Sequence, residues 1–145
     1  MKVGLVSDTH GRFDPALPLL FSRCDLLVHA GDVVGREILA MLEAIAPLSA
    51  VRGNNDLGHF GAGLHETAVL RLEGVKALVI HILGSPRKPA PAARKAIERE
   101  RPDLVIYGHS HVPAVEMLDG VLYVNPGSAG PRRFNYPRSA GILTV

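Results

Sequence analysis

The chain has 145 residues, enough for one domain with a sizeable core, and 47% of them are hydrophobic, which argues against disorder. Its formal net charge of +2 and its aromatic content of 5%, with no tryptophan, disfavour a duplex-binding surface and base-stacking platforms. The single cysteine, Cys24, excludes an internal disulfide and is compatible with a reducing compartment.

The N-terminus lacks the pattern of a targeting segment. Only five residues, 3–7, separate Lys2 from the first acidic residue, too few for the apolar core of a signal peptide. No apolar run approaches the ~20 residues that cross a membrane as a helix. We therefore expect a cytoplasmic protein with a single domain over residues 1–145.

The first half of the chain alternates strand and helix patterns. Asp14 suits the N-cap and Pro15 the first position of a helix over residues 14–23, and four apolar residues at helical spacing predict a second helix over residues 35–46. The β-α-β-α-β order favours a parallel sheet. Apolar runs predict its strands at residues 2–7, 25–32 and 48–56.

The second half of the chain is dominated by hairpin patterns. Residues 67–82 are predicted to be two strands joined by a Glu-Gly turn, and residues 114–125 a hairpin with an Asp-Gly turn. Between them, residues 85–101 form a proline-rich loop that leads into a basic helix, and residues 140–145 close the chain as a strand. This order predicts a mixed α/β domain in which two sheets pack face to face.

Side chains that bind metals follow five of the predicted strands. The carboxyl ends of parallel strands line one crevice of an α/β sheet, so these side chains can converge although they are far apart in the sequence. Carboxylate, imidazole and amide donors without a thiolate suit Mn, Fe, Co, Ni or Zn. The candidate ligands are Asp8, His10, Asp32, Asn54, His81, His109 and His111.

Each of these segments has another interpretation when it is taken alone. Residues 8–10 are equally consistent with a capped turn, residues 53–56 are more often a turn than a site, and a lone His81 is more often a hydrogen-bonded core histidine. Five ligand-bearing strand ends in one chain are hard to explain as turns. If one aspartate bridges, the ligands and water complete two sites about 3.5–4 Å apart, the arrangement used for in-line displacement at phosphorus.

The series DTHG, GD, GNND, a histidine after the fifth apolar strand, GHSH and NPGS resembles the calcineurin-like metallophosphoesterases, from Met1 to about Ser128. It is most similar to their small single-domain branch, the YfcE-type phosphodiesterases and the VPS29-type retromer subunits. The resemblance implies two divalent metal ions in a four-layer α-β-β-α sandwich, with two mixed sheets flanked by helices. By motif position, Asp8, His10 and His111 would hold the first ion, Asn54, His81 and His109 the second, and Asp32 would bridge both.

The sequence departs from the family pattern in two places. Many relatives have a histidine, thought to protonate the leaving group, where this chain has Asn55, and Ile82 and Leu83 make the rim of the site more apolar. The small branch commonly lacks that histidine, so the change concerns leaving-group protonation rather than family membership. The candidate catalytic residues are Asn54, His109 and, as a substitute acid, His59.

The resemblance implies a dimetal phosphoric diester hydrolase, in which a hydroxide that bridges two divalent transition-metal ions attacks phosphorus in line. Mn²⁺ is the expected activator in vitro, with Zn²⁺, Fe²⁺, Ni²⁺ and Co²⁺ as other candidates. The expected substrate is a small phosphodiester or nucleotide-like molecule, with no membrane and no stable nucleic-acid partner, and a homo-oligomer is left open. The alternative function is a metal-binding protein-interaction scaffold of the VPS29 type.

Several residues outside the ligand set have structural expectations. The basic segments 87–101 and 132–138 are most simply solvated faces, and the alternative is that one of them attracts an anionic substrate. Gly108 is expected to let the backbone approach the site closely, Ser128 to be a partner of a ligand histidine, and His29 to be a hydrogen-bonded residue at a strand end.

Overall fold

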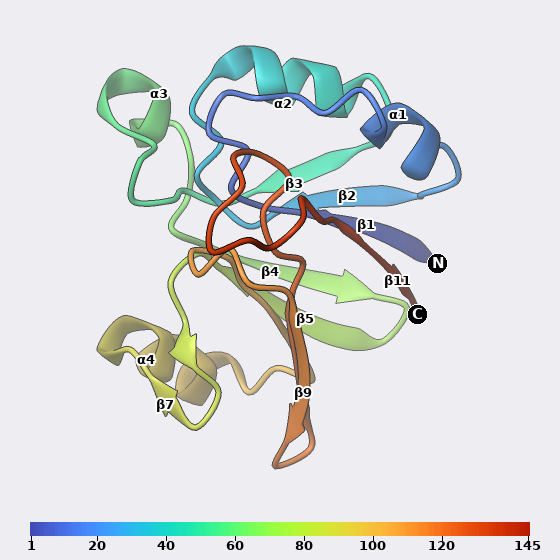
Figure 1. The fold of residues 1–145 in the computed structure, drawn as a ribbon. Helices are drawn as coiled ribbons and strands as arrows, with labels where there is room; N and C mark the ends of the chain where they lie inside the picture. The colour runs from blue at the N-terminus through green and yellow to red at the C-terminus, as the bar shows by residue number, and fades with distance from the viewer.

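The N-terminal sheet of the computed structural model, which describes residues 1–145, has four strands in the order β11-β1-β2-β3 (Figure 1). The first three strands run parallel, and the C-terminal strand returns to pair antiparallel with the first. The parallel β-α-β-α-β unit predicted from the alternation of strands and helices is therefore present. The strands are β1 (Lys2–Val6), β2 (Leu26–His29), β3 (Leu48–Ala50) and β11 (Gly141–Thr144).

The second sheet has five strands in the order β4-β5-β8-β10-β9. Its three central strands are parallel, and both edge strands are antiparallel to their neighbours. Each edge strand is joined to its neighbouring strand by a tight turn, at Glu73-Gly74 and at Asp119-Gly120. All four turn residues have positive φ, as type I′ hairpins require. The strands are β4 (Thr67–Leu72), β5 (Val75–Ile80), β8 (Leu104–Ile106), β9 (Ala114–Leu118) and β10 (Val121–Asn125).

Helices cover the outer faces of both sheets, which gives four layers (Figure 1). α1 (Leu17–Leu20) and α2 (Arg36–Glu43) pack on the first sheet, and α4 (Pro91–Glu100) packs on the second. Alternation along β2 shows how one strand serves two layers, because Leu27 is buried against the helices while Val28 is buried between the sheets. The predicted sandwich of two mixed sheets flanked by helices is confirmed.

Three local elements differ from the sequence predictions. The helix predicted over residues 14–23 is confined to α1, because Asp14 instead accepts a hydrogen bond from the Ala16 amide at 2.9 Å and prolines remove two helical donors. A short α3 (Gly58–Ala62) forms in a segment to which the sequence analysis assigned no element, and a hairpin of β6 (Gly84–Ser85) and β7 (Lys88–Pro89) forms at the proline-rich loop. None of the helices is long and apolar enough to cross a membrane.

The carboxyl ends of the parallel strands of both sheets lie at one edge of the sandwich. Within the sheets, Val6 pairs with His29, and Val79 of β5 pairs with Ile106 of β8. Across the sheets, the carbonyl of Ala30 lies 2.7 Å from Nδ1 of His81, so the loop after β2 is hydrogen-bonded to the end of β5. The packing of the two sheets therefore brings five strand ends together.

Candidate metal centre

Six of the seven candidate ligands form a continuous series of polar side chains at this edge, and the ring of the seventh, His109, lies beside His81. Neighbouring polar atoms in the series are separated by distances between 3.1 and 3.5 Å. In order, the series is Asp8, His111, His10, Asp32, His81 and Asn54.

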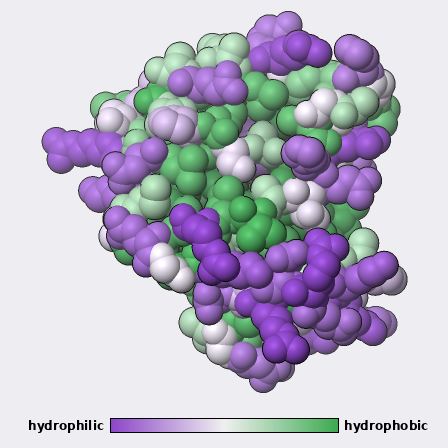
Figure 2. Space-filling model, turned by 180° about the vertical axis from the view of Figure 1, so that it is seen from behind, coloured by the Kyte–Doolittle hydropathy of each residue, from purple (hydrophilic) through white to green (hydrophobic).

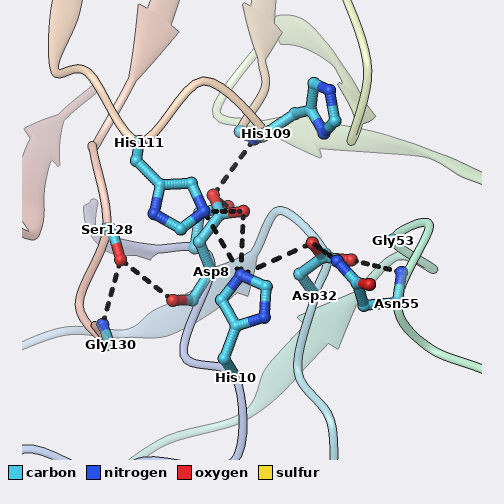
Figure 3. Close-up of polar contacts among 12 residues, drawn as sticks. Asp8, His10, Asp32, Gly53, Asn55, His109, His111, Ser128 and Gly130 are labelled. Carbon is cyan, nitrogen blue, oxygen red and sulfur yellow. Dashed lines mark hydrogen bonds and ion pairs between the residues drawn. The ribbon is translucent and has the colours of Figure 1, made fainter. Parts of the chain in front are cut away.

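The inner half of the centre consists of Asp8, His10 and His111. Nε2 of His111 lies 3.3 Å from Oδ1 of Asp8 and 3.2 Å from Nε2 of His10 (Figure 3). These three donor atoms lie within 4.8 Å of one another. The two imidazoles and the carboxylate therefore face a common point.

Two buried polar atoms of the inner half, Oδ1 of Asp8 and Nδ1 of His111, have no hydrogen-bond partner. An unpaired buried polar atom costs about 1–3 kcal/mol, and more when it is charged. A cation placed among the donor atoms would satisfy Oδ1 of Asp8 and remove the repulsion between the converging lone pairs. The residues present therefore fit a divalent metal ion.

The outer half of the centre consists of Asn54, His81 and His109. Nε2 of His81 lies 3.1 Å from Oδ1 of Asn54 and 3.4 Å from Oδ2 of Asp32. The His109 ring is exposed and stands edge-on to His81, with 5.2 Å between the ring centroids. Oδ2 of Asp32 is also 3.5 Å from Nε2 of His10, so Asp32 lies between the two halves.

Hydrogen bonds orient both carboxylates of the centre. Oδ2 of Asp8 accepts from the Ser7 hydroxyl at 2.6 Å and from the His109 amide at 3.0 Å, which leaves Oδ1 directed at the histidines. Asp32 accepts from the backbone amide of Asn55 at 2.8 Å and from its side-chain amide at 2.7 Å (Figure 3). These partners fix the direction of the lone pairs that face the centre.

The backbone at the centre is strained. Five of the seven candidate ligands have φ in the left-handed region, which costs a residue with a Cβ about 1–3 kcal/mol. Such strain persists only where the surrounding contacts impose it, and it is concentrated at functional sites. The φ values are 54° for Asp8, 47° for His10, 56° for Asp32, 71° for His109 and 62° for His111.

Two glycines permit the close approach of loops around the carboxylates. A Cβ on Gly108 would lie 2.0 Å from the Ser7 hydroxyl, and a Cβ on Gly53 would lie 2.1 Å from the backbone nitrogen of Asp32. Both distances are far below van der Waals contact, so neither position accepts a larger residue without displacement. The close approach expected at Gly108 is present.

The electrostatics of the centre favour an anionic Asp32. Burial by itself would raise the pKa of Asp32, but hydrogen bonds from His81 and Asn55 outweigh it and hold that pKa well below its usual range. Burial would lower the pKa of His81, whereas its contacts with Asp32, Asp8 and the Ala30 carbonyl raise it above the ordinary value. For His111, burial dominates and lowers the pKa, which favours the neutral imidazole.

One structural support of the centre, Asp56, was missed by the sequence analysis. Asp56 is buried and accepts from the amides of Val34 at 2.8 Å and Gly53 at 2.7 Å, so it ties the loop of Asp32 to the loop of Asn54. Its only sequence signal is an aspartate at the end of GNND, which was assigned to a turn. A tertiary contact over more than 20 positions has no local pattern to reveal it.

His29 is the hydrogen-bonded strand-end residue that the sequence suggested. Its Nδ1 accepts from the Gly31 amide at 3.1 Å, so its Nε2 carries the proton and donates to the Thr9 hydroxyl at 3.0 Å. That hydroxyl donates to the carbonyl of Val33 at 3.0 Å. Burial is the main reason why the pKa of His29 falls to about 3, and the neighbouring histidines His81 and His10 lower it further.

Three expectations about surrounding residues need revision. The hydroxyl of Ser128 donates to the Asp8 carbonyl at 3.0 Å rather than to a histidine, so it supports the loop backbone. Ile82 is exposed at the rim, but Leu83 is buried in the core against α4. In the second basic segment, Arg138 is paired with Asp14 at 2.9 Å and is not free to attract a substrate.

His59, the candidate substitute acid, lies on α3 and is exposed. It makes no hydrogen bond to any of the seven candidate ligands. Its assignment as a catalytic residue therefore stays a prediction. Asn55, which occupies the position of the family histidine, uses its side-chain amide to hold Asp32.

Comparisons with known proteins agree with this geometry. A family model described as the calcineurin-like phosphoesterase superfamily domain matches residues 1–145. A probable metallophosphoesterase of Methanothermobacter thermautotrophicus is 31% identical over 150 residues, covering 100% of this chain and 86% of the relative.

Two further relatives have solved structures. The phosphodiesterase YfcE of Escherichia coli is 29% identical over 169 residues, covering 99% of this chain and 87% of the relative. Its solved structure superposes with a TM-score of 0.74 at 26% identity, over 99% of this chain and 88% of that one. Vps29 of Entamoeba histolytica in complex with Zn²⁺ superposes with a TM-score of 0.78 at 25% identity, over 100% of this chain and 86% of that one.

Proposed function

Because the chain belongs to the calcineurin-like phosphoesterase superfamily, we propose that it is a metal-dependent hydrolase of small phosphodiesters, with its active centre in one domain of residues 1–145. The observation that supports this most strongly is the series of six polar side chains that contains the unpaired Oδ1 of Asp8 and ends at the exposed Asn54. A purely structural cluster would pair its buried atoms. A centre that leaves one side open suits a substrate.

The donor set suits two divalent transition-metal ions. The inner half would hold one and the outer half the other, and Asp32, whose Oδ2 lies near both His10 and His81, would contact both. When bound, such ions supply Lewis-acid stabilisation of phosphate charge and acidify the water that attacks phosphorus. Mixed nitrogen and oxygen donors without a thiolate favour Mn²⁺ as the activator in vitro, with Zn²⁺, Fe²⁺, Ni²⁺ and Co²⁺ as competitors.

Asn54 and His109 are the exposed members of the candidate set, so we assign them the contact with substrate. Their side chains would hold the phosphate of the diester against the outer half as catalytic residues, and would donate hydrogen bonds to its oxygens as charge builds up. The buried members, which have almost no surface to offer a substrate, are Asp8, Asp32, His81 and His111. Their part is to fix the charge and the geometry of the centre.

The leaving group needs a proton from a source other than Asn55, because the Asn55 amide is engaged with Asp32. His59 is our candidate donor, and general acid help of this kind contributes about 10²–10⁴-fold, mostly for poor leaving groups. His59→Ala should therefore slow alkyl diesters far more than nitrophenyl diesters. His65→Ala, another exposed histidine of the same region, is the control. Equal slowing of both substrate classes by His59→Ala would remove it from the mechanism.

The second candidate function is a metal-binding scaffold for other proteins. The similarity to Vps29 of Entamoeba histolytica favours it, since that fold match covers the whole chain. The complete set of candidate ligands favours the enzyme instead, because a scaffold has no need for seven converging donor side chains.

A metal-by-substrate screen separates the two functions. The purified protein is stripped of metal, reloaded with Mn²⁺, Co²⁺, Ni²⁺, Zn²⁺ or Fe²⁺, and assayed with bis(nitrophenyl) phosphate while bound metal is measured in the same samples. We expect Mn²⁺ to support hydrolysis, whether or not other ions do so as well. Bound metal with no hydrolysis for any ion would favour the scaffold.

A further inference from the structure

A cavity of about 490 Å³ opens beside the outer half of the metal centre. Asn54 and His81 form part of its wall, so the cavity is continuous with the place where the phosphate of a diester is proposed to lie. Its volume falls within the ~300–1,000 Å³ typical of sites for small molecules. The inner half contributes no residue to its lining, so the cavity extends the centre in one direction only.

One face of α4 forms the wall of this cavity. Ala92, Lys95, Ala96 and Arg99 line it, and their spacing of three and four residues places them in one row along the helix. Figure 2 shows hydrophilic side chains gathered over the lower part of the rear face, at the end of the molecule where α4 lies in Figure 1. Of the basic residues of this helix, Lys95 and Arg99 line the cavity, whereas Arg94 does not.

The cavity has more positive than negative charge. Three cations, Arg52, Lys95 and Arg99, line it together with one carboxylate, Glu66. Arg99 is paired with Glu100 at 2.7 Å, whereas Arg52 and Lys95 take part in none of the ion pairs of the protein. A cavity with two unpaired cations attracts an anion, and its walls strengthen that attraction relative to an open surface.

Part of the uncharged lining is apolar, and the lining contains no phenylalanine, tyrosine or tryptophan. Ile80, Ile82, Ala92 and Ala96 provide the hydrophobic surface. This surface suits a carbon skeleton, but it offers no platform on which a nucleobase could stack. The anion recognised here is therefore expected at the end of a short aliphatic or sugar unit.

We propose that this cavity binds the alcohol half of the diester when that alcohol carries a second phosphate group, with Lys95 and Arg99 on α4 and Arg52 as the phosphate-binding cations. The inference rests on the proposed function, since it names the substrate class of the same centre. The phosphodiester group under attack carries a single negative charge, which the metal centre accommodates. The cations of the cavity lie to one side of that centre and match a further anionic group, as a phosphate ester on the leaving or retained alcohol would supply.

The experiment compares two nitrophenyl phosphodiesters of propanediol, one with a free far hydroxyl and one with that hydroxyl phosphorylated. With the Mn²⁺-loaded protein, kcat/KM should be roughly tenfold higher for the phosphorylated compound, because the cations of the cavity attract its second phosphate. In the double variant Lys95→Gln/Arg99→Gln, which keeps only Arg52 of the three cations, the ratio of the two kcat/KM values should fall toward one. Added salt should lower the ratio in the wild-type protein.

Arg94→Gln is the matched control, because Arg94 is exposed on α4 but does not line the cavity, and glutamine maintains the helix about as well as arginine and lysine do. This variant should retain the wild-type ratio. The same ratio for wild type and the double variant, or an equal loss in Arg94→Gln, would overturn the proposal while leaving the hydrolase function intact.

A binding measurement makes the inference independent of turnover. Without metal, the carboxylates of the centre repel phosphate, so calorimetry with propanediol monophosphate and the metal-free protein reports on the cavity. The dissociation constant should rise roughly tenfold in the double variant and stay unchanged in Arg94→Gln. If this difference is found while no diester is hydrolysed, the proposed function fails and the anion site stands. Equal binding by all three proteins would refute the site.

Discussion

The inner and outer halves of the metal centre use the same kinds of side chain, but the protein exposes them very differently. Asp8 and His111 of the inner half are 0% and 3% exposed, whereas Asn54 and His109 of the outer half are open to solvent. Only His81 is buried in the outer half, and the Ala30 carbonyl holds its ring so that Nε2 faces Asp32. The inner half is therefore part of the core, while the outer half is part of the surface.

This difference indicates that the fold assigns positioning of the centre and contact with substrate to different residues. Residues that set the charge and position of the centre are oriented by hydrogen bonds, as Oδ2 of Asp8 is by the Ser7 hydroxyl and the His109 amide. The residues expected to contact substrate, Asn54 and His109, are exposed, and Asn54 borders the basic cavity. We therefore expect the inner half to bind its metal ion more tightly and the outer half to determine substrate selectivity.

Asp32→Asn should have the largest effect, because Asp32 lies between the two halves and its loss affects both. Turnover of bis(nitrophenyl) phosphate should fall on the order of a thousandfold or more, and metal content should fall with it. Asp119→Asn, which changes an aspartate to asparagine at an exposed hairpin turn, should leave both unchanged. Near-normal turnover with full metal content in Asp32→Asn would show that Asp32 does not join the halves.

Asp8→Ala and Asn54→Ala should separate the two halves. Removing the buried Asp8 should cost the inner ion, and removing the exposed Asn54 should weaken only the outer ion, about 10–100-fold in affinity. Metal content at increasing Mn²⁺ concentration measures this for both variants. If the two variants lost metal to the same degree at every concentration, the division into halves would be wrong.

Asn55→Ala should have a smaller effect, since it removes one of the two hydrogen bonds that Asn55 makes to Asp32 and leaves the backbone bond in place. We expect activity to fall about 10–100-fold, with the protein still folded. Leu57→Ala, an exposed change in the same loop, is the control for a general disturbance of that loop. An unchanged rate in Asn55→Ala would mean that the backbone amide alone positions Asp32.

The smallest expected effect concerns His29, which packs close to the inner half. Its protonation should make the stability of the protein depend on pH. The pKa of His29 is lowered from 6.5 to about 3, so the unfolded chain binds a proton throughout that interval while the folded protein does not. The contribution of neutral His29 to stability is complete above pH 6.5 and is lost as the pH falls toward 3.

Urea unfolding of the metal-free protein at several pH values tests this, with His29→Gln as the comparison. The free energy of unfolding of the wild type should fall toward that of the variant by up to about 1.4 kcal/mol per pH unit inside the interval. A constant difference between the two proteins would mean that His29 does not remain neutral in the folded state.

The elements that could be predicted from the sequence are those with a local cause. The type I′ turns at Glu73-Gly74 and Asp119-Gly120 follow from two residues each, and the parallel strands follow from alternation along the chain. The gathering of polar strand ends was also predictable, because parallel strands present their carboxyl ends at one edge. The structure brings the candidate ligands together as expected, while their binding of metal stays a prediction.

The features that escaped prediction depend on contacts between distant segments. Asp56 resembles a turn residue in the sequence, yet it holds two loops together through backbone amides. Nothing local showed that Lys95 and Arg99 would line the cavity beside the outer half, because that depends on how α4 packs on the second sheet. The short α1 was overestimated since Asp14 suits a turn as well as a helix cap.

The number and position of bound Mn²⁺ ions test the account most directly. Calorimetric titration of the metal-free protein gives the number, and anomalous diffraction from crystals of the loaded protein gives the positions. We expect two ions per chain, with Asp32 in contact with both. The tighter ion should lie at Asp8, His10 and His111, and the weaker one at Asn54, His81 and His109. Saturation at one ion, or a second ion placed away from Asn54 and His81, would contradict it.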